Sequence, residues 1–274
     1  SLSTGRGYLG GAGTSTFGLA FGGQTPPVSN ATEEFSEYSE PNAFLNIGQT
    51  FYNSTSKEFK YTSATTVGTW ASGGNLPAAR TSIPSCGTQT AGLAAGGFLT
   101  GSSPTAGNVK ADSYEYDGSS WTAGGTMGTA QYRGSAAGTQ TAAFVASGRV
   151  YAPSVAAKPA TEEYDGSSWT AGGALSTARY VAAQGGTLTA GLVAGGYVPG
   201  TVGLTTTFEY DGTNWTSGGA MNVARAFSAS GNGSQTAALI TGGFTTPTGE
   251  LTSSEHYDGS SWSTRPSIST ARSQ

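Results

Sequence analysis

The chain has 274 residues, of which only 10% are charged and 44 are glycine, and its formal net charge is −4. It lacks the cluster of Lys and Arg that binding to a phosphate backbone requires, which argues against nucleic acid as a partner. The single cysteine, Cys86, excludes an intramolecular disulfide, and no run of about 18 apolar residues marks a membrane span.

The N-terminal segment begins a β-rich repeat unit, with a small-residue run followed by an apolar run that ends in a glycine pair at Gly23. This first unit is longer than the later ones, because it carries an insertion at about residues 36–60. We expect the insertion to form a hairpin or lid packed on the main fold, as a docking element or as an ornamental loop. Phe35 and Phe59 are alternative starting points for the third strand of the unit.

One motif recurs along the chain. EYDGSSWTAGG occupies residues 115–125 and again 163–173, and close variants occupy 209–219 and 256–264. Each unit also has an apolar run that ends in a glycine pair or near-pair. A unit of about 47 residues with four short strand-like runs is typical of a propeller blade. The tryptophans that mark the five units are Trp70, Trp121, Trp169, Trp215 and Trp262.

Counting the units predicts an all-β fold, a closed five-bladed β-propeller of four-stranded antiparallel blades with an inserted segment in the first blade. The innermost strands are mostly Gly, Ala and Ser, which suits strands that converge on a narrow axis. The C-terminal SISTARSQ begins the same unit again, so a longer array cut at both ends stays an alternative. The predicted single domain is 1–274, with blades at about 5–73, 78–125, 130–173, 178–219 and 224–264.

Four of the five aspartates in the chain occupy one position of the repeat, directly before a glycine. Asp-Gly between two strand-like runs is a strong hairpin signal, because glycine accepts positive φ and the Asp side chain can bond to the backbone of the turn. We interpret these aspartates as turn formers, in preference to metal ligands or acid and base catalysts. They are Asp117, Asp165, Asp211 and Asp258.

The order of these markers resembles the kelch repeat over nearly the whole chain, with Gly after the Asp where kelch repeats usually have Pro. The wording YDGSSWTAGG together with GTQTA is also similar to kelch-like proteins of marine bacteriophages. The resemblance implies a propeller fold and a virion component. In one unit the residues that carry it are Glu209, Tyr210, Asp211, Trp215, Met221, Arg225, Gly242 and Gly243.

The repeated aromatic and arginine residues are interpreted as structural. Each Trp and Tyr is expected to pack between blades, where a ring buries about 150 to 250 Å²; a ring of sugar-stacking tryptophans is the alternative. Planar arginines are expected to tie loop carbonyls and carboxylates together, and an anion site at the axis is the alternative. The arginines are Arg80, Arg179, Arg225 and Arg272, with Gln131 in the remaining unit and Arg133 two residues later.

The connections after the glycine pairs differ from unit to unit, whereas the Asp-Gly turns are nearly identical. Variable loops on a regular scaffold are where binding usually resides. We therefore place the contact surface on the face with the variable loops, with stacking surfaces for a glycan; alternatively these aromatics cover the ends of the blade cores. The candidate binding residues are Phe98, Tyr151, Tyr197 and Phe244.

Catalysis has little basis in this sequence. The single histidine, His256, occupies the position that is Glu in three other units, so no Ser-His-Asp set can be assembled. We expect a protein that is not an enzyme and that uses no metal and no cofactor.

The predicted function is a binding or structural propeller on a virion surface, in a tail fibre or capsid appendage, that contacts a host receptor or glycan. Its expected partners are protein or glycan on a cell surface, with other virion proteins or further copies of the chain, and neither nucleic acid nor membrane insertion. The expected localisation is the virion surface or extracellular space. A soluble lectin or protein-interaction propeller of bacterial origin is the alternative.

Overall fold

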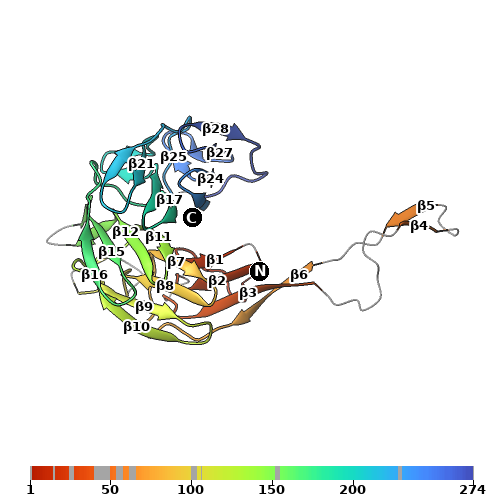
Figure 1. Ribbon diagram of the computed structural model, residues 1–274, viewed down its shortest axis with the longest axis horizontal. Helices are drawn as coiled ribbons and strands as arrows, with labels where there is room; N and C mark the ends of the chain where they lie inside the picture. Colours follow the sequence, from red (N-terminus) through yellow and green to blue (C-terminus); the bar gives the residue numbers. More distant parts are fainter. Residues whose placement is uncertain are drawn as a thin grey trace.

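The computed structural model of the protein describes residues 2–14, 16–24, 28–39, 50–53, 58–61, 66–99, 104–105, 107–151, 155–227 and 230–273. This part of the chain forms strands and no helix, and it accordingly holds no helical segment long and apolar enough to cross a membrane. Five four-stranded antiparallel sheets are arranged in a ring (Figure 1). The fold is therefore a five-bladed β-propeller, as predicted.

Within each blade the chain runs outward from the axis, and every strand pairs with the next. Blade 1 contains β1 (Gly10–Gly13), β2 (Phe17–Phe21), β3 (Thr32–Ser39) and β6 (Thr66–Ser72), and blade 2 contains β7 (Ser85–Thr88), β8 (Ala91–Ala95), β9 (Asp112–Tyr116) and β10 (Trp121–Thr126). Blade 3 contains β11 (Ser135–Thr139), β12 (Ala142–Ala146), β15 (Thr161–Tyr164) and β16 (Trp169–Gly172). Blade 4 contains β17 (Ala183–Thr187), β18 (Ala190–Ala194), β21 (Thr207–Tyr210) and β22 (Trp215–Ser217), and blade 5 contains β23 (Ser230–Ser234), β24 (Ala237–Thr241), β27 (Ser254–Tyr257) and β28 (Trp262–Arg265).

Small hairpins extend the connection after the second strand in blades 3, 4 and 5. Each begins directly after the glycine or glycine pair that follows the second strand, so the variable loops start as short antiparallel ribbons. The hairpins are β13 (Arg149–Tyr151) with β14 (Val155–Ala157), β19 (Tyr197–Val198) with β20 (Thr201–Val202), and β25 (Phe244–Thr245) with β26 (Gly249–Glu250).

The Asp-Gly turns join the third and fourth strands. Asp117 Oδ1 accepts hydrogen bonds of 2.8 Å from the backbone N–H groups of Ser119 and Ser120, and Gly118 has φ +93°. The bonds to Ser120 and Ser119 lower the pKa of Asp117 to about 2. The interpretation of these residues as turn formers is confirmed, because the same backbone bonds recur at Asp165, Asp211 and Asp258.

The insertion leaves blade 1 between β3 and β6, where the other four blades have their Asp-Gly turn. β3 pairs with both β2 and β6 and places Phe35 opposite Trp70, so Phe35, and not Phe59, lies in the regular third strand. The strands β4 (Thr50–Asn53) and β5 (Glu58–Tyr61) form the expected hairpin. The expected packing of the insertion on the main fold is not observed, because Figure 1 places this hairpin beyond β6, away from the ring.

Four junctions between neighbouring blades share one arrangement, and we call them the sealed junctions. At the first, Trp121 packs on Leu19 of blade 1, and its Nε1 donates a 3.0 Å hydrogen bond to Thr32. The hydroxyl of Tyr116 donates to the Glu34 carboxylate. The other sealed junctions repeat both bonds, in the pairs Trp169–Ser113, Trp215–Thr161, Trp262–Thr207, Tyr164–Glu115, Tyr210–Glu163 and Tyr257–Glu209.

The junction between blades 5 and 1, which we call the seam, is built differently. The inner strands pack in sequence from β1 to β7, β11, β17 and β23, whereas β23 and β1 do not pack on each other in this way. Figure 1 shows the two blades parted at the right of the ring. The prediction of a closed ring is therefore wrong at this junction. A physical reason is that the Tyr and Glu of the sealed junctions are replaced there by Phe35 and His256.

Candidate binding site at the axial mouth

Five residues, one at the same position of each blade, have a left-handed backbone although none is glycine. Their φ angles lie between +51° and +57°, and each residue lies two or three positions before the inner strand of its blade. A non-glycine residue in this conformation costs about 1 to 3 kcal/mol and persists only where the surroundings enforce it. These residues, which we call the axial ring, are Tyr8, Ser82, Arg133, Val181 and Phe227.

Backbone hydrogen bonds between neighbouring blades enforce this conformation. Ser82 N–H donates to the carbonyl of Tyr8 at 2.9 Å, and Arg133 N–H donates to the carbonyl of Ser82 at 3.0 Å. The series continues from Val181 N–H to Arg133 at 3.1 Å and from Phe227 N–H to Val181 at 3.0 Å. Four bonds thus run round the axis, so the ring and not the local sequence fixes the backbone of these five residues.

Four of the five axial ring residues line a pocket of about 190 Å³ between the inner strands of blades 1 to 4. Its wall includes Tyr8, Ser82, Arg133 and Val181, and deeper residues of the inner strands such as Gln184. Pockets for drug-sized ligands usually measure about 300 to 1,000 Å³, so this one suits a single chemical group of a larger ligand. The pocket, which we call the axial mouth, lies at the ends of the blades where the variable loops begin.

Arg133 carries the positive charge of the axial mouth. Its guanidinium carbon lies 5.1 Å from the ring centroid of Tyr8 and 5.8 Å from that of Phe227, so the side chain reaches from blade 3 to blades 1 and 5. Its Nε is buried without a hydrogen-bond partner. Among the described residues no carboxylate forms an ion pair with it. A cation framed by two aromatic rings is thus available to a ligand.

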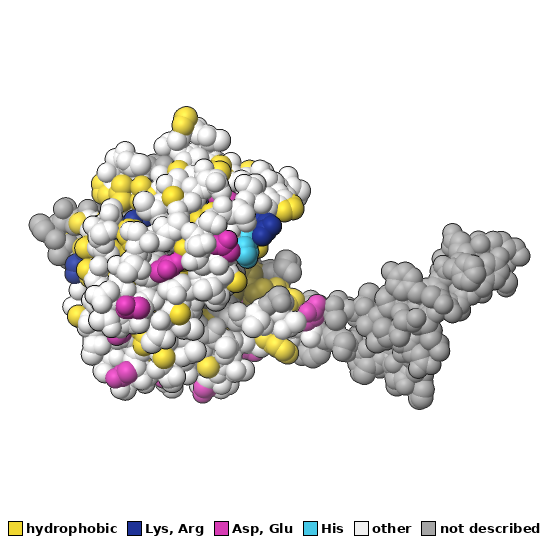
Figure 2. All heavy atoms as spheres, turned by 45° about the horizontal axis from the view of Figure 1, so that its top comes forward, with side chains coloured by type: hydrophobic (Ala, Val, Ile, Leu, Met, Phe, Trp, Pro, Cys, Tyr) yellow, Lys and Arg dark blue, Asp and Glu magenta, His cyan; other side chains and the backbone are white. Residues whose placement is uncertain are grey.

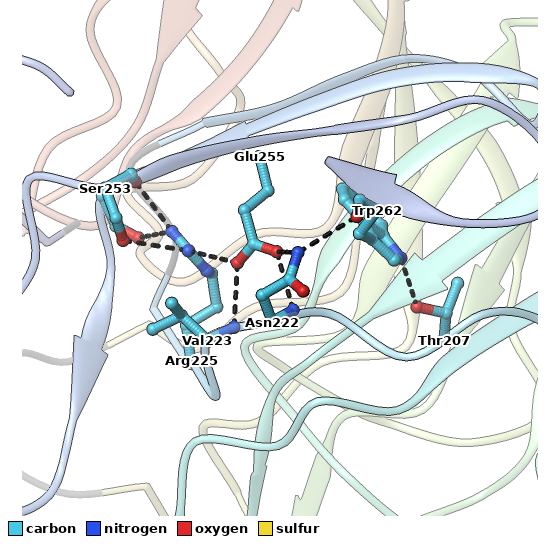
Figure 3. A network of polar contacts seen from close by, with 8 residues as sticks. Thr207, Asn222, Val223, Arg225, Ser253, Glu255 and Trp262 are labelled. Atoms are coloured by element: carbon cyan, nitrogen blue, oxygen red, sulfur yellow. Dashed lines mark hydrogen bonds and ion pairs between the residues drawn. The ribbon is translucent and has the colours of Figure 1, made fainter. Parts of the chain in front are cut away.

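The arginines of the repeat have a different environment. Arg225 is fully buried, donates to the carbonyl of Gly242 at 2.7 Å and pairs with Glu255 at 2.8 Å (Figure 3). Glu255 also accepts the backbone N–H groups of Asn222 and Val223. Arg80, Arg179 and Arg225 are buried, hold loops to blades and leave no charge for a ligand, whereas Arg272 is exposed. Arg179 donates to Gly195 O, with its pKa lowered to about 10 by burial, and Arg80 donates to Gly96 O and pairs with Asp112.

The four aromatic residues predicted to bind lie around the axial mouth. Phe98 is buried, with its ring edge-on to Tyr132 at 5.2 Å, and Tyr151 packs half-buried against the same cluster. Tyr197 is half-buried with its ring 4.8 Å from that of Tyr180. The fourth residue, Phe244, is half-buried.

Backbone bridges connect three of these four aromatics to the axial ring. Phe98, Tyr197 and Phe244 each bridge to the residue directly before an axial ring residue, namely Thr81, Tyr180 and Ala226. Tyr151 is in β13, whose first residue, Arg149, bridges Tyr132 in the same way. The predicted aromatics therefore form an outer circle on the same face as the axial mouth, with the ring of Phe98 committed to packing.

The sequence reasoning missed the axial ring, although a signal for it exists. Each of its members stands two residues after the Arg or Gln of its unit, as Arg133 stands after Gln131. Side chains at this position differ in every unit, in contrast to the repeated residues around them. A variable residue at a fixed place in a regular repeat is the pattern that would have indicated the site.

Titratable groups in the described part of the chain do not gather into a metal site. No group of three or more His, Cys, Asp or Glu residues there could hold a metal ion. The Cys86 thiol is buried, and burial raises its pKa to about 12. Figure 2 shows charged side chains few and scattered over a mostly uncharged face.

Comparison with known proteins relates this chain to others by shape alone. No family model matches the sequence, and no curated protein matches it. Among solved structures, that of YjhT is similar, with a TM-score of 0.68 over 97% of this chain and 85% of that chain, at 12% sequence identity. At this identity the similarity supports the propeller fold and carries nothing about activity.

Proposed function

We propose that the protein is a non-enzymatic binding propeller that holds its partner on the loop face, with the axial mouth at the centre of the contact. The observation that carries this proposal is Arg133, an unpaired cation between the rings of Tyr8 and Phe227 at a strained position. The axial ring and the outer aromatic circle differ from blade to blade, so this face can recognise one asymmetric partner.

The chemistry of the mouth favours a ligand that combines an anionic group with an apolar or sugar face. A planar guanidinium pairs well with a carboxylate, and aromatic rings beside it offer a stacking surface. The pocket volume of about 190 Å³ admits one such group, and the outer circle contacts what surrounds it. We propose a glycan or protein on a cell surface as the partner.

The proposed biological setting is a virion appendage built from kelch-type repeats. The recurring order of glycine pair, Glu, Tyr, Asp and Trp supports the assignment of kelch-type repeats. The similarity of the motif sequences to those of phage proteins supports a place on a virion. An antibody against the chain is then expected to label purified phage particles and to block their adsorption. Labelling of bacterial culture fluid without particles would favour a soluble lectin instead.

The binding proposal is tested by Arg133→Ala on an array of neutral and carboxylate-bearing glycans and on whole bacterial cells. Loss of a charge-assisted contact should weaken binding by about tenfold to a hundredfold. Arg265→Ala is the matched control, because it removes the same charge from an exposed position outside the pocket. Binding that is unchanged by Arg133→Ala would overturn the proposal, and binding to cells alone would indicate a protein receptor.

A further inference from the structure

The seam differs from the sealed junctions at both members of one contact. In a sealed junction the Tyr of one blade bonds to the Glu of the blade before it, as Tyr164 bonds to Glu115 at 2.6 Å. Phe35 lies opposite Trp70 as Tyr164 lies opposite Trp169, so it takes the Tyr position of blade 1. His256 lies opposite Leu239 as Glu115 lies opposite Leu93, so it takes the Glu position of blade 5.

The seam leaves apolar surface uncovered on blade 5. Leu239 is 44% exposed, whereas the residues at its position in blades 1 to 4 are 0 to 3% exposed under the Tyr and Trp of the next blade. Those four residues, in order, are Leu19, Leu93, Phe144 and Leu192.

Blade 1 has an apolar surface on its own side of the seam. Phe35 and Trp70 are half-buried, and their ring centroids are 5.3 Å apart. They occupy the positions at which a Tyr and a Trp cover the apolar residue of the preceding blade in the sealed junctions. Each side of the seam thus presents one half of a blade-to-blade contact.

The two halves fit each other better than either fits a further blade of the repeated kind. Such a blade would bring a Tyr hydroxyl to His256 and a Glu carboxylate to Phe35, which could not donate to it. When blade 1 faces blade 5, Phe35 has no hydroxyl and therefore needs no carboxylate acceptor. His256 stands where a Glu would otherwise be left without a hydroxyl donor. The seam retains the residues for the second bond of a sealed junction, the one from Trp to a hydroxyl. Trp70 and Ser254 occupy the positions of Trp121 and Thr32, which form that bond in the first sealed junction.

The axis already holds the two blades near each other. Arg133 contacts the rings of Tyr8 and Phe227, which belong to blades 1 and 5, and the four bonds of the axial ring run between the same two residues. The blades are therefore linked at their inner ends through blade 3, while their outer parts are separated in Figure 1. A rotation about the inner end would bring the two apolar faces together.

We propose that the seam is a gate that closes when blade 5 docks on blade 1. In the closed state Leu239 is covered by Phe35 and Trp70, and Trp70 Nε1 donates to Ser254 Oγ. The described structure is the open state. Closing the seam buries apolar side chains and forms one hydrogen bond, but it forms no Tyr–Glu bond. The seam is therefore the weakest of the five junctions and the one that opens.

Thiol labelling tests this proposal, because the chain has one native cysteine and it is unreactive. Cys86 is buried and its pKa is raised to about 12 by burial, so it contributes little thiolate. The test variant is Leu239→Cys. The matched control is Phe17→Cys, at a residue that is 52% exposed in β2 and faces the side of blade 1 away from the seam, on which Leu19 also lies.

A closing gate should make the Leu239→Cys variant react with a thiol reagent about tenfold more slowly than the Phe17→Cys variant. Adding Trp70→Ala should restore fast labelling at position 239 and leave the control rate unchanged. His256→Cys, on the same face of blade 5, provides a second test position, and circular dichroism checks that each variant is folded.

Three results would overturn the proposal. Equal labelling rates at positions 239 and 17 would mean that the seam stays open. Protection at position 239 that survives Trp70→Ala would mean that blade 1 is not the cover. Protection that increases with protein concentration would mean that a second copy of the chain covers the face.

Discussion

The four sealed junctions and the seam show how one repeat can build two kinds of contact. A sealed junction combines a buried Tyr and a buried or half-buried Trp with two hydrogen bonds to the preceding blade, as Tyr116 and Trp121 do with Glu34 and Thr32. The seam keeps the Trp and the hydroxyl acceptor but replaces the Tyr and the Glu. The difference indicates that a blade interface depends on a matched pair of Tyr and Glu. Changing both residues removes the hydrogen bond without leaving an unpaired carboxylate.

Alkaline pH should separate the two kinds of junction with the largest effect. Burial, and secondly the bond to a carboxylate, raises the pKa of Tyr116 from 10.0 to about 12, and the pKa values of Tyr164, Tyr210 and Tyr257 rise to about 12 for the same reasons. A raised folded-state pKa means that the stabilisation is complete below pH 10 and is lost as the pH rises through about 12. We expect the protein to unfold cooperatively between pH 10 and about pH 12. Circular dichroism and tyrosinate absorbance measure this transition.

The alkaline prediction involves the sealed junctions alone, because Phe35 has no hydroxyl to titrate. The prediction is contradicted if all tyrosines ionise with the pKa of free tyrosine while the circular dichroism stays unchanged up to about pH 12. That result would show that burial and the bonds to carboxylates do not raise the pKa of the four hydroxyls.

Removing a tryptophan should cost more at a sealed junction than at the seam. Trp121→Ala deletes a buried ring and its bond to Thr32, and we expect a loss of about 3 to 5 kcal/mol in the free energy of unfolding. Trp70→Ala deletes a half-buried ring, and we expect a loss of about 1 kcal/mol. Denaturant unfolding of both variants measures the difference, and equal losses would break the comparison.

Removing a single hydroxyl tests the matched pair directly. Tyr164→Phe leaves the Glu115 carboxylate without its donor, so the free energy of unfolding should fall by about 1 to 3 kcal/mol. Tyr151→Phe, at a half-buried tyrosine outside the junctions, is the control and should change it by less than about 0.5 kcal/mol. A loss at position 164 no larger than at position 151 would contradict the role given to the Tyr–Glu bond.

Rebuilding the missing pair at the seam should give the smallest effect and the opposite sign. Phe35→Tyr combined with His256→Glu restores the residues of a sealed junction. We expect the double variant to be more stable than the sum of the two single changes by about 1 kcal/mol. A double-mutant cycle in denaturant measures this coupling, and a coupling of zero would indicate that blades 5 and 1 do not meet.

The blades and their turns could be predicted from the sequence because they depend on residues close together in the chain. Asp117 and Gly118 define a turn in which Asp117 accepts bonds from Ser119 and Ser120, and the number of such turns indicated the number of blades. The alternative starts for the third strand of blade 1 could not be separated, because Phe35 and Phe59 both follow a Glu. Pairing with β2 decided between them.

The axial ring and the open seam could not be predicted, because both arise between blades. A left-handed backbone at Val181 contradicts the preference of a β-branched residue and exists because its N–H reaches Arg133 of the neighbouring blade. The seam depends on two exchanges, Phe35 and His256, that are far apart in sequence. Only alignment of the units in three dimensions shows that these two positions face the same junction.

The four bonds of the axial ring make a spiral with two ends, at Tyr8 and Phe227, and both ends lie at the seam. The hydrogen bonds around the axis therefore form an interrupted ring and not a continuous one. In a solid ring the bore is set once by the number of blades. In an interrupted ring the bore can change with the width of the gap, and we therefore expect the size of the axial mouth around Arg133 to differ between the open and closed states of the seam.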